Sequence, residues 1–135
     1  MSFEYPQKVL FKHCDPAGLV FYPRFFEMIN DCVEAFFAEI GLPFDALHRT
    51  HAIPTVEITT EFTAPCRLGD DLILRLTCTR LGRTSLGLCI GARGSDGPRF
   101  QAKSTIVFTT LQGQPTPWPD ALRTQFTRHI EEPAS

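Results

Sequence analysis

The sequence predicts an α+β domain in which one long helix lies across a curved antiparallel sheet. Two observations carry this prediction. Residues 23–40 repeat apolar side chains at helical spacing, and four later segments alternate apolar and polar residues with a period of two. At 135 residues the chain is expected to form a single domain, with a core from residues 3–110 and a tail from residues 111–135.

The helix is framed by clear start and stop signals. Asp15-Pro16-Ala17-Gly18 has the residue order of a type I turn, and Pro23 lies where the first turn of a helix tolerates proline. Gly41-Leu42-Pro43 marks its end. One face is expected to be buried, formed by Phe25, Phe26, Ile29, Val33, Phe36, Phe37 and Ile40.

Five strands are expected around this helix. Residues 3–13 form the first, with Val9, Phe11 and His13 on one face, and four more follow at 53–62, 71–79, 84–92 and 99–109. Short turns, including Ser95-Asp96-Gly97-Pro98, predict an antiparallel meander in chain order. The inward sets are Val56, Ile58, Phe62; Leu72, Leu74, Leu76, Cys78; Leu86, Leu88, Ile90, Ala92; and Phe100, Ala102, Ser104, Ile106, Phe108.

The tail is expected to end in a short peripheral helix over residues 120–130, with Trp118 or Leu122 and Phe126 packing against the core. The exposed strand edges would be covered most simply by a second copy of the chain, which predicts a homo-oligomer.

Composition excludes several functional classes. The net charge is −2 with no basic stripe, which argues against nucleic acid as the main partner. No apolar run is long enough for membrane insertion and the first residues lack a signal-peptide layout, so we expect a cytoplasmic protein. The five cysteines and four histidines are scattered, which predicts neither a disulfide framework nor a metal site.

Asp15 is the candidate catalytic group. It lies a few residues before a helix start, whose free N–H groups favour negative charge, so the pair suits acyl transfer. The alternative is that its side chain only hydrogen-bonds its own turn. His13 and Cys14 suggest a cysteine nucleophile, but neighbouring side chains of an extended segment diverge. His13 is either a pocket residue or, more simply, a locally bonded one.

Residues 15–26, DPAGLVFYPRFF, closely resemble the signature of the 4-hydroxybenzoyl-CoA thioesterase family. This resemblance implies a hotdog fold, in which a five-stranded antiparallel sheet wraps a long central helix. It also implies hydrolysis of acyl-CoA thioesters without a cofactor, in a homodimer or homotetramer whose active sites lie between subunits.

The resemblance assigns roles to individual residues. Asp15 matches the catalytic aspartate, acting as nucleophile or general base, and Tyr22 matches the residue whose backbone N–H polarises the thioester carbonyl. Gly18 matches the glycine that approaches the acyl group. Coenzyme A would bind near Arg83, Thr84 and Ser85, with Arg80 close by. Phe21, Phe25 or Phe26 could line the acyl pocket.

Some features leave alternatives open. Asn30 stands where the hydroxybenzoyl enzyme carries an acid, so the acyl specificity is open. Arg83 could equally be a solvated hairpin residue, while His48 and His51 have no assignable role. A non-catalytic acyl-CoA or acyl-carrier binding protein is the main rival. A hydratase is disfavoured because residues 23–40 contain no histidine, only the acids Glu27, Asp31, Glu34 and Glu39.

Overall fold

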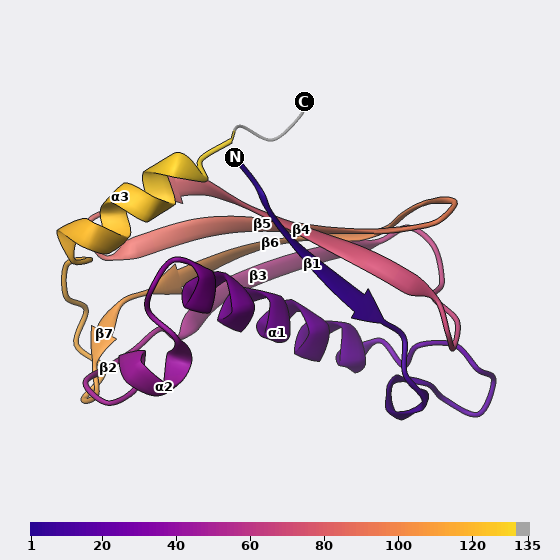
Figure 1. The fold of residues 1–135 in the computed structure, drawn as a ribbon. Helices are drawn as coiled ribbons and strands as arrows, with labels where there is room; N and C mark the ends of the chain where they lie inside the picture. Colours follow the sequence, from indigo (N-terminus) through magenta and orange to yellow (C-terminus); the bar gives the residue numbers. More distant parts are fainter. Residues whose placement is uncertain (132–135) are drawn as a thin grey trace.

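The computed structural model describes residues 1–131. It contains a main antiparallel sheet, a long helix along one face of that sheet, and a shorter helix at one end (Figure 1). In chain order the elements are β1 (Phe3–Lys8), a 3-10 helix η1 (Phe11–His13), α1 (Pro23–Glu39), α2 (Phe44–Leu47), β2 (His51–Ala52), β3 (Thr55–Phe62), β4 (Asp71–Leu81), β5 (Ser85–Gly94), β6 (Gly97–Val107), β7 (Thr109–Thr110) and α3 (Asp120–Arg128).

The five main strands lie in the order β1-β4-β5-β6-β3, all antiparallel to their neighbours, and β2 pairs separately with β7. The α+β class and the five-stranded antiparallel sheet are therefore confirmed. The prediction of a four-strand meander in chain order is wrong for β3. That strand pairs with β6, from Thr55 opposite Ile106 to Phe62 opposite Phe100, while β1 takes the place beside β4.

The core lies between α1 and the sheet. The predicted inward residues of β4, β5 and β6 are buried, as is the apolar face of α1 apart from the partly exposed Phe26. The sheet covers one side of this 17-residue helix; Arg24, Asn30 and Glu34 on its other side are exposed. The picture of a central helix wrapped by the sheet thus holds for one side of the helix.

The predicted C-terminal helix is α3, and it packs across the end of α1. Phe126 is fully buried, with its ring centroid 6.4 Å from that of Phe36 and 5.9 Å from that of Phe37. Trp118 stacks on Phe108 and donates its Nε1–H to the Ser85 carbonyl at 3.0 Å. These contacts fix the tail against the β4–β5 turn.

The first strand is shorter than predicted. It ends at Lys8, and residues 11–13 form η1, so Val9, Phe11 and His13 do not share a strand face. Val9 is buried while Phe11 is 78% exposed. The cause is local: His13 Nδ1 accepts the Leu10 N–H at 2.9 Å, which closes a turn where an extended chain was expected.

Strand β3 forms a free edge of the sheet. Its predicted apolar residues Val56, Ile58 and Phe62 remain 61%, 39% and 46% exposed. Within residues 1–131 the strand pairs with β6 alone, so the backbone groups along its other side have no strand partner. A long, apolar edge of this kind is a template for pairing with another chain.

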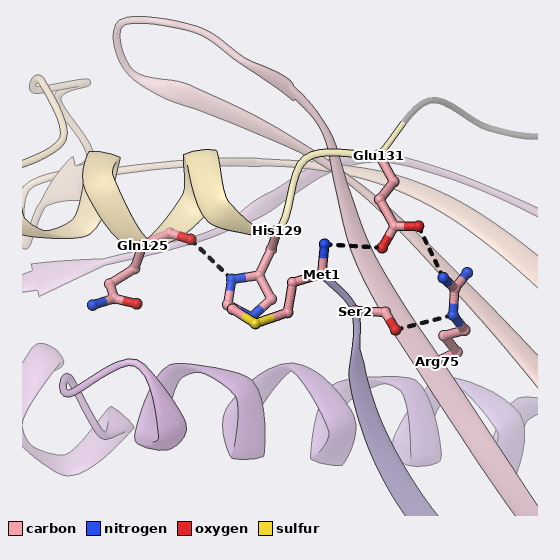
Figure 2. A network of polar contacts seen from close by, with 6 residues as sticks. All are labelled: Met1, Ser2, Arg75, Gln125, His129 and Glu131. Atoms are coloured by element: carbon pink, nitrogen blue, oxygen red, sulfur yellow. Dashed lines mark hydrogen bonds and ion pairs between the residues drawn. The ribbon is translucent and has the colours of Figure 1, made fainter.

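A polar network joins the two ends of the chain to β4 (Figure 2). Glu131 contacts the Met1 amino group at 3.4 Å and the Arg75 guanidinium at 2.9 Å, and Arg75 also donates to the Ser2 hydroxyl. The Arg75 hydrogen bond lowers the pKa of the Glu131 carboxyl, and the positive charges of Arg75 and the amino terminus act in the same direction. The network therefore stabilises the fold when Glu131 is ionised.

Replacing Glu131 by Gln should reduce stability in a pH-dependent way. Because the folded-state pKa is depressed, the stabilisation is present above the ordinary carboxyl pKa of 4.5 and is lost as the pH falls through the folded-state pKa. Urea unfolding should show a lower midpoint for Glu131→Gln at pH 7, with the difference from wild type shrinking at acid pH. A difference that persists unchanged at pH 3 would contradict this assignment.

Candidate active site

The turn at residues 15–18 has the predicted hydrogen bond, from the Gly18 N–H to the Asp15 carbonyl at 3.0 Å. Gly18 adopts a φ of +79°, a left-handed conformation that favours glycine. The Asp15 Oδ1 accepts the Ala17 N–H at 2.8 Å and, more weakly, the Leu19 N–H at 3.4 Å. Within residues 1–131 no hydrogen bond engages Oδ2 of this exposed side chain. The turn thus fixes the carboxylate through one oxygen and leaves the other open.

The connection between β3 and β4 is hydrogen-bonded to this turn and to the residues that follow it. The Val20 N–H donates to the Cys66 carbonyl at 2.9 Å, and the Leu68 N–H donates to the Gly18 carbonyl at 3.0 Å. Leu19 also forms an isolated bridge with Arg67. Residues 63–70, the β3–β4 connection, therefore form one wall of the Asp15 site.

The start of α1 presents a free donor. Arg24 and Phe25 donate their N–H groups to Phe21 and Tyr22, and Pro23 has none. Within the described chain the Tyr22 N–H has no acceptor, and the first turn of α1 carries no acidic side chain to satisfy it. The helix dipole adds partial positive charge at this point. A negatively charged oxygen can therefore bind here.

His13 and Cys14 do not form a nucleophilic pair. The His13 ring is 3% exposed and bonded locally to Leu10, and burial, followed by the nearby Lys12 charge, lowers its pKa. The Cys14 thiol lies within 3.6 Å of the Leu10 carbonyl. The locally bonded alternative for His13 is confirmed, and its site near η1 is structural.

The cysteines of the core are equally unsuited to nucleophilic chemistry. Burial raises the pKa of Cys32 and Cys78 to about 12 and that of Cys66 to about 11. All five cysteines are free thiols, and four of them are buried. Reactive cysteines need the opposite environment, one that stabilises the thiolate.

A cavity of about 320 Å³ lies further along α1, between that helix, α2 and β3. Its walls include Phe26 and Asn30 of α1, His48 after α2, and Ile58 of β3. Phe21 is 50% exposed beside Tyr22, while Phe25 is buried against Phe62 and Phe100 in the core. Among the three phenylalanines named as candidates, Phe26 is the one that lines this cavity.

The turn between β4 and β5, which contains Arg83 and Thr84 and leads into Ser85, lies at the other end of the sheet from the segment between β1 and α1 (Figure 1). The Asp15 turn contacts the segment before β4, whereas these residues follow it, and the 11 residues of β4 span about 35 Å. Arg123 of α3 donates to the Gly82 carbonyl at 2.9 Å and holds this turn. One chain therefore does not bring Arg83 to its own Asp15.

The sequence does not indicate that residues 63–70 border the Asp15 turn, or that Arg99 holds this segment in place. Arg99 is 8% exposed, pairs with Asp96, and accepts the Thr63 and Ala64 N–H groups at its carbonyl. No local pattern connects Arg99 with a turn more than 80 residues earlier, so only tertiary structure could reveal this link. His48, which had no assigned role, lines the cavity together with residues of α1 and β6 that are distant from it in the sequence.

No group of three or more His, Cys, Asp or Glu side chains within residues 1–131 is arranged to hold a metal ion. Among the same residues, none of the helices has the length and apolar character needed to cross a membrane.

Gly18→Ala should test the geometry of the turn. An Ala side chain at a φ of +79° costs about 1–2 kcal/mol, and no neighbouring atom lies within 4 Å, so strain alone is measured. The free energy of unfolding, from urea titration, should fall by that amount. Gly91→Ala is the matched control, since it also has open space but no positive φ, and should leave stability unchanged or raised. Equal effects of the two substitutions would contradict the turn geometry.

The chain is similar to known proteins over most of its length. A family model described as the thioesterase-like superfamily matches residues 9–126. A 1,4-dihydroxy-2-naphthoyl-CoA hydrolase from Synechocystis is 28% identical over 81 residues, which are 58% of this chain and 59% of that protein. The alignment thus spans less than two thirds of the curated relative.

Solved structures extend the similarity to the whole fold. A 1,4-dihydroxy-2-naphthoyl-CoA thioesterase from Synechocystis superposes with a TM-score of 0.86 at 22% identity, covering 94% of this chain and 96% of that one. A gentisyl-coenzyme A thioesterase superposes with a TM-score of 0.85 at 26% identity, covering 92% of this chain and 99% of that one. The first of these likenesses concerns the fold alone.

Proposed function

This chain belongs to the thioesterase-like superfamily, and we propose that it is an acyl-CoA thioester hydrolase with Asp15 as its catalytic carboxylate. The observation that supports this most directly is that the turn before α1 leaves one Asp15 carboxylate oxygen open, while the helix that follows begins with an N–H that no acceptor engages within residues 1–131. No metal or organic cofactor is needed for such a reaction.

The two groups divide the chemistry between them. Asp15 Oδ2 either removes a proton from a water molecule that attacks the thioester carbon, or attacks that carbon itself to form an anhydride that water then hydrolyses. In both routes the carbonyl oxygen becomes negative and accepts a hydrogen bond from the Tyr22 N–H, and the C–S bond then breaks. The sulfur of coenzyme A receives the proton that Asp15 took from water in the first route, or a proton from solvent water in the second. An oxyanion donor of this kind lowers the barrier by about 3–4 kcal/mol.

The named relatives suggest a substrate class. The curated relative is a hydrolase of dihydroxynaphthoyl-CoA, and one solved structure is that of a gentisyl-CoA thioesterase. Both act on thioesters of hydroxylated aromatic acids. We therefore place hydroxyaryl-CoA thioesters first among the candidate substrates; 4-hydroxybenzoyl-CoA itself is one member to be tested.

A non-catalytic acyl-CoA binding protein is the second candidate, favoured by one observation. Asp15 Oδ1 accepts two N–H groups of its own turn, which is how a purely structural aspartate behaves. The two functions differ in turnover, because a binding protein would release no thiol from any acyl-CoA.

Asp15→Asn should abolish hydrolysis while leaving the fold intact. The amide can keep the turn hydrogen bond through its oxygen but can act neither as base nor as nucleophile, so turnover should fall about 100-fold or more. Free-thiol release from a panel of acyl-CoA thioesters measures this. Asp120→Asn, an exposed aspartate at the start of α3, is the matched control, and Cys14→Ser tests the cysteine alternative; both should retain turnover.

Three results would decide between the alternatives. Full activity of Asp15→Asn would remove Asp15 from the mechanism. Loss of activity in Cys14→Ser alone would revive the cysteine nucleophile. Saturable binding of acyl-CoA by wild type without any thiol release would favour the non-catalytic function.

The protein is also proposed to act as a homodimer formed through β3, alone or as part of a tetramer. The support is the unpaired edge of β3 with its exposed Val56 and Ile58. An antiparallel β3–β3 pair has a two-fold axis that exchanges the two ends of the sheet. The partner's Arg83 turn would then lie at the same end as Asp15, where it could bind the coenzyme A phosphates.

Val56→Lys should convert the dimer to monomer, since it places a charge on the edge where two strands would meet, at a residue that does not line the cavity. Light scattering after size exclusion should give about twice 15.2 kDa for wild type and 15.2 kDa for the variant, with thiol release lost in the monomer. Leu111→Lys, at another exposed apolar residue, should remain dimeric. An active monomeric wild type would contradict a shared site.

A further inference from the structure

We infer that the 320 Å³ cavity between α1, α2 and β3 receives the acyl group, and that His48 in its wall selects acyl groups carrying a hydroxyl remote from the thioester. This inference rests on the proposed function and names the acyl chemistry that the site takes. Nothing in the sequence pattern assigns a role to His48.

The cavity has the size and lining of a ligand pocket. Apolar side chains from α1 and β3, including Ile29, Val33 and Ile58, form most of its walls, and its volume lies within the usual range for small-molecule sites. These walls suit the carbon skeleton of an acyl group, whose burial supplies binding energy in proportion to its apolar area.

The position of the cavity matches the position of the thioester. Phe26 at one end lies a single helical turn from Tyr22, about 6 Å along the axis, and Val33 lies about 16 Å from it. Of the α1 residues that line the cavity, Phe26 is therefore the nearest to Tyr22, and an acyl group whose carbonyl is bound at the Tyr22 N–H could extend along α1 into the cavity. The distal end of the acyl group would approach His48.

The His48 ring is held in one tautomer. Its Nδ1 lies 2.8 Å from the Phe44 carbonyl oxygen, which can only accept, so Nδ1 carries the proton. The ring also packs edge-on against Phe44, with centroids 5.1 Å apart. His48 is exposed in the free chain, and in its neutral imidazole Nε2 is an acceptor held at a fixed position relative to Phe44 by these two contacts.

A fixed acceptor in a mainly apolar cavity discriminates between ligands. The other polar wall residues, among them Asn30 and Ser104, carry both donors and acceptors and adapt to either kind of group. Nε2 of the neutral ring only accepts. A distal hydroxyl satisfies it, whereas a distal methyl removes water from it and offers nothing in return.

The test compares acyl groups that differ by one hydroxyl. Octanoyl-CoA is paired with 8-hydroxyoctanoyl-CoA, and 2-naphthoyl-CoA with 6-hydroxy-2-naphthoyl-CoA, with kcat/KM measured by thiol release. Wild type should prefer the hydroxylated member of at least one pair about three- to tenfold, the ratio expected for one neutral hydrogen bond.

Two substitutions of His48 distinguish the acceptor role of Nε2 from the contact between Nδ1 and the Phe44 carbonyl. Asn can donate to the Phe44 carbonyl as Nδ1 does but has no atom at the Nε2 position, so His48→Asn should lose the hydroxyl preference. Gln places an amide oxygen near the Nε2 position, so His48→Gln should retain a preference. The ratio of kcat/KM within each pair carries the result, because His48 lines the acyl cavity and its substitution can change the binding of both members of a pair equally.

Binding of thioether analogues makes the result independent of turnover. Calorimetry with S-octyl-CoA and S-(8-hydroxyoctyl)-CoA, and with the matching naphthylmethyl pair, should show the same preference and the same loss in His48→Asn. Thiol release without any hydroxyl preference would overturn this inference and leave the proposed function standing. Selective thioether binding without any thiol release would overturn the proposed function and leave the inference about His48 standing. A preference that survives in His48→Asn would also overturn the role of His48.

Discussion

The candidate site depends on a set of backbone hydrogen bonds between two distant segments. Residues 18–20, just after the Asp15 turn, exchange hydrogen bonds with Cys66 and Leu68 in the β3–β4 connection. Val9 and Gly69 add two more, from Val9 N–H to Asp70 and from Gly69 N–H to Val9. Because these bonds join the end of β1, the start of β4 and the entry to α1, they fix the carboxylate relative to the helix. Backbone bonds of this kind tolerate many side chains, so the arrangement does not require a recognisable sequence at residues 63–70.

This constraint explains which parts of the molecule the sequence could predict. The alternation of Leu72, Leu74 and Leu76 reports a strand with one buried face, and the Asp-Pro-Ala-Gly order reports a turn. Both signals are local. No local signal reports that β3 lies beside β6, because alternation shows which face of a strand is buried but not which strands lie next to it. His48 is a different case, because its partner Phe44 lies only four residues earlier, in α2, a short helix that the sequence does not indicate.

The extent of β1 shows a second limit. Residues 9–13 alternate as a strand would, yet a single side-chain acceptor, His13 Nδ1, closes them into η1. Local side-chain hydrogen bonds compete with strand formation and are not visible as periodicity. The resulting turn directs the chain toward the Asp15 site, because the His13 carbonyl accepts the Phe21 N–H at 2.9 Å. His13 thus shapes the site through its backbone carbonyl, while its buried ring is bonded to Leu10.

The central claim is that Asp15 and the Tyr22 N–H lie on either side of one thioester carbonyl. A crystal structure with a non-hydrolysable acyl-CoA analogue that keeps a carbonyl in place of the thioester tests it most directly. The account predicts the carbonyl oxygen about 3 Å from the Tyr22 nitrogen, and Asp15 Oδ2 within about 3.5 Å of the carbonyl carbon or of a water bound beside it. A carbonyl bound away from the start of α1, with Asp15 still engaged only by its own turn, would contradict it.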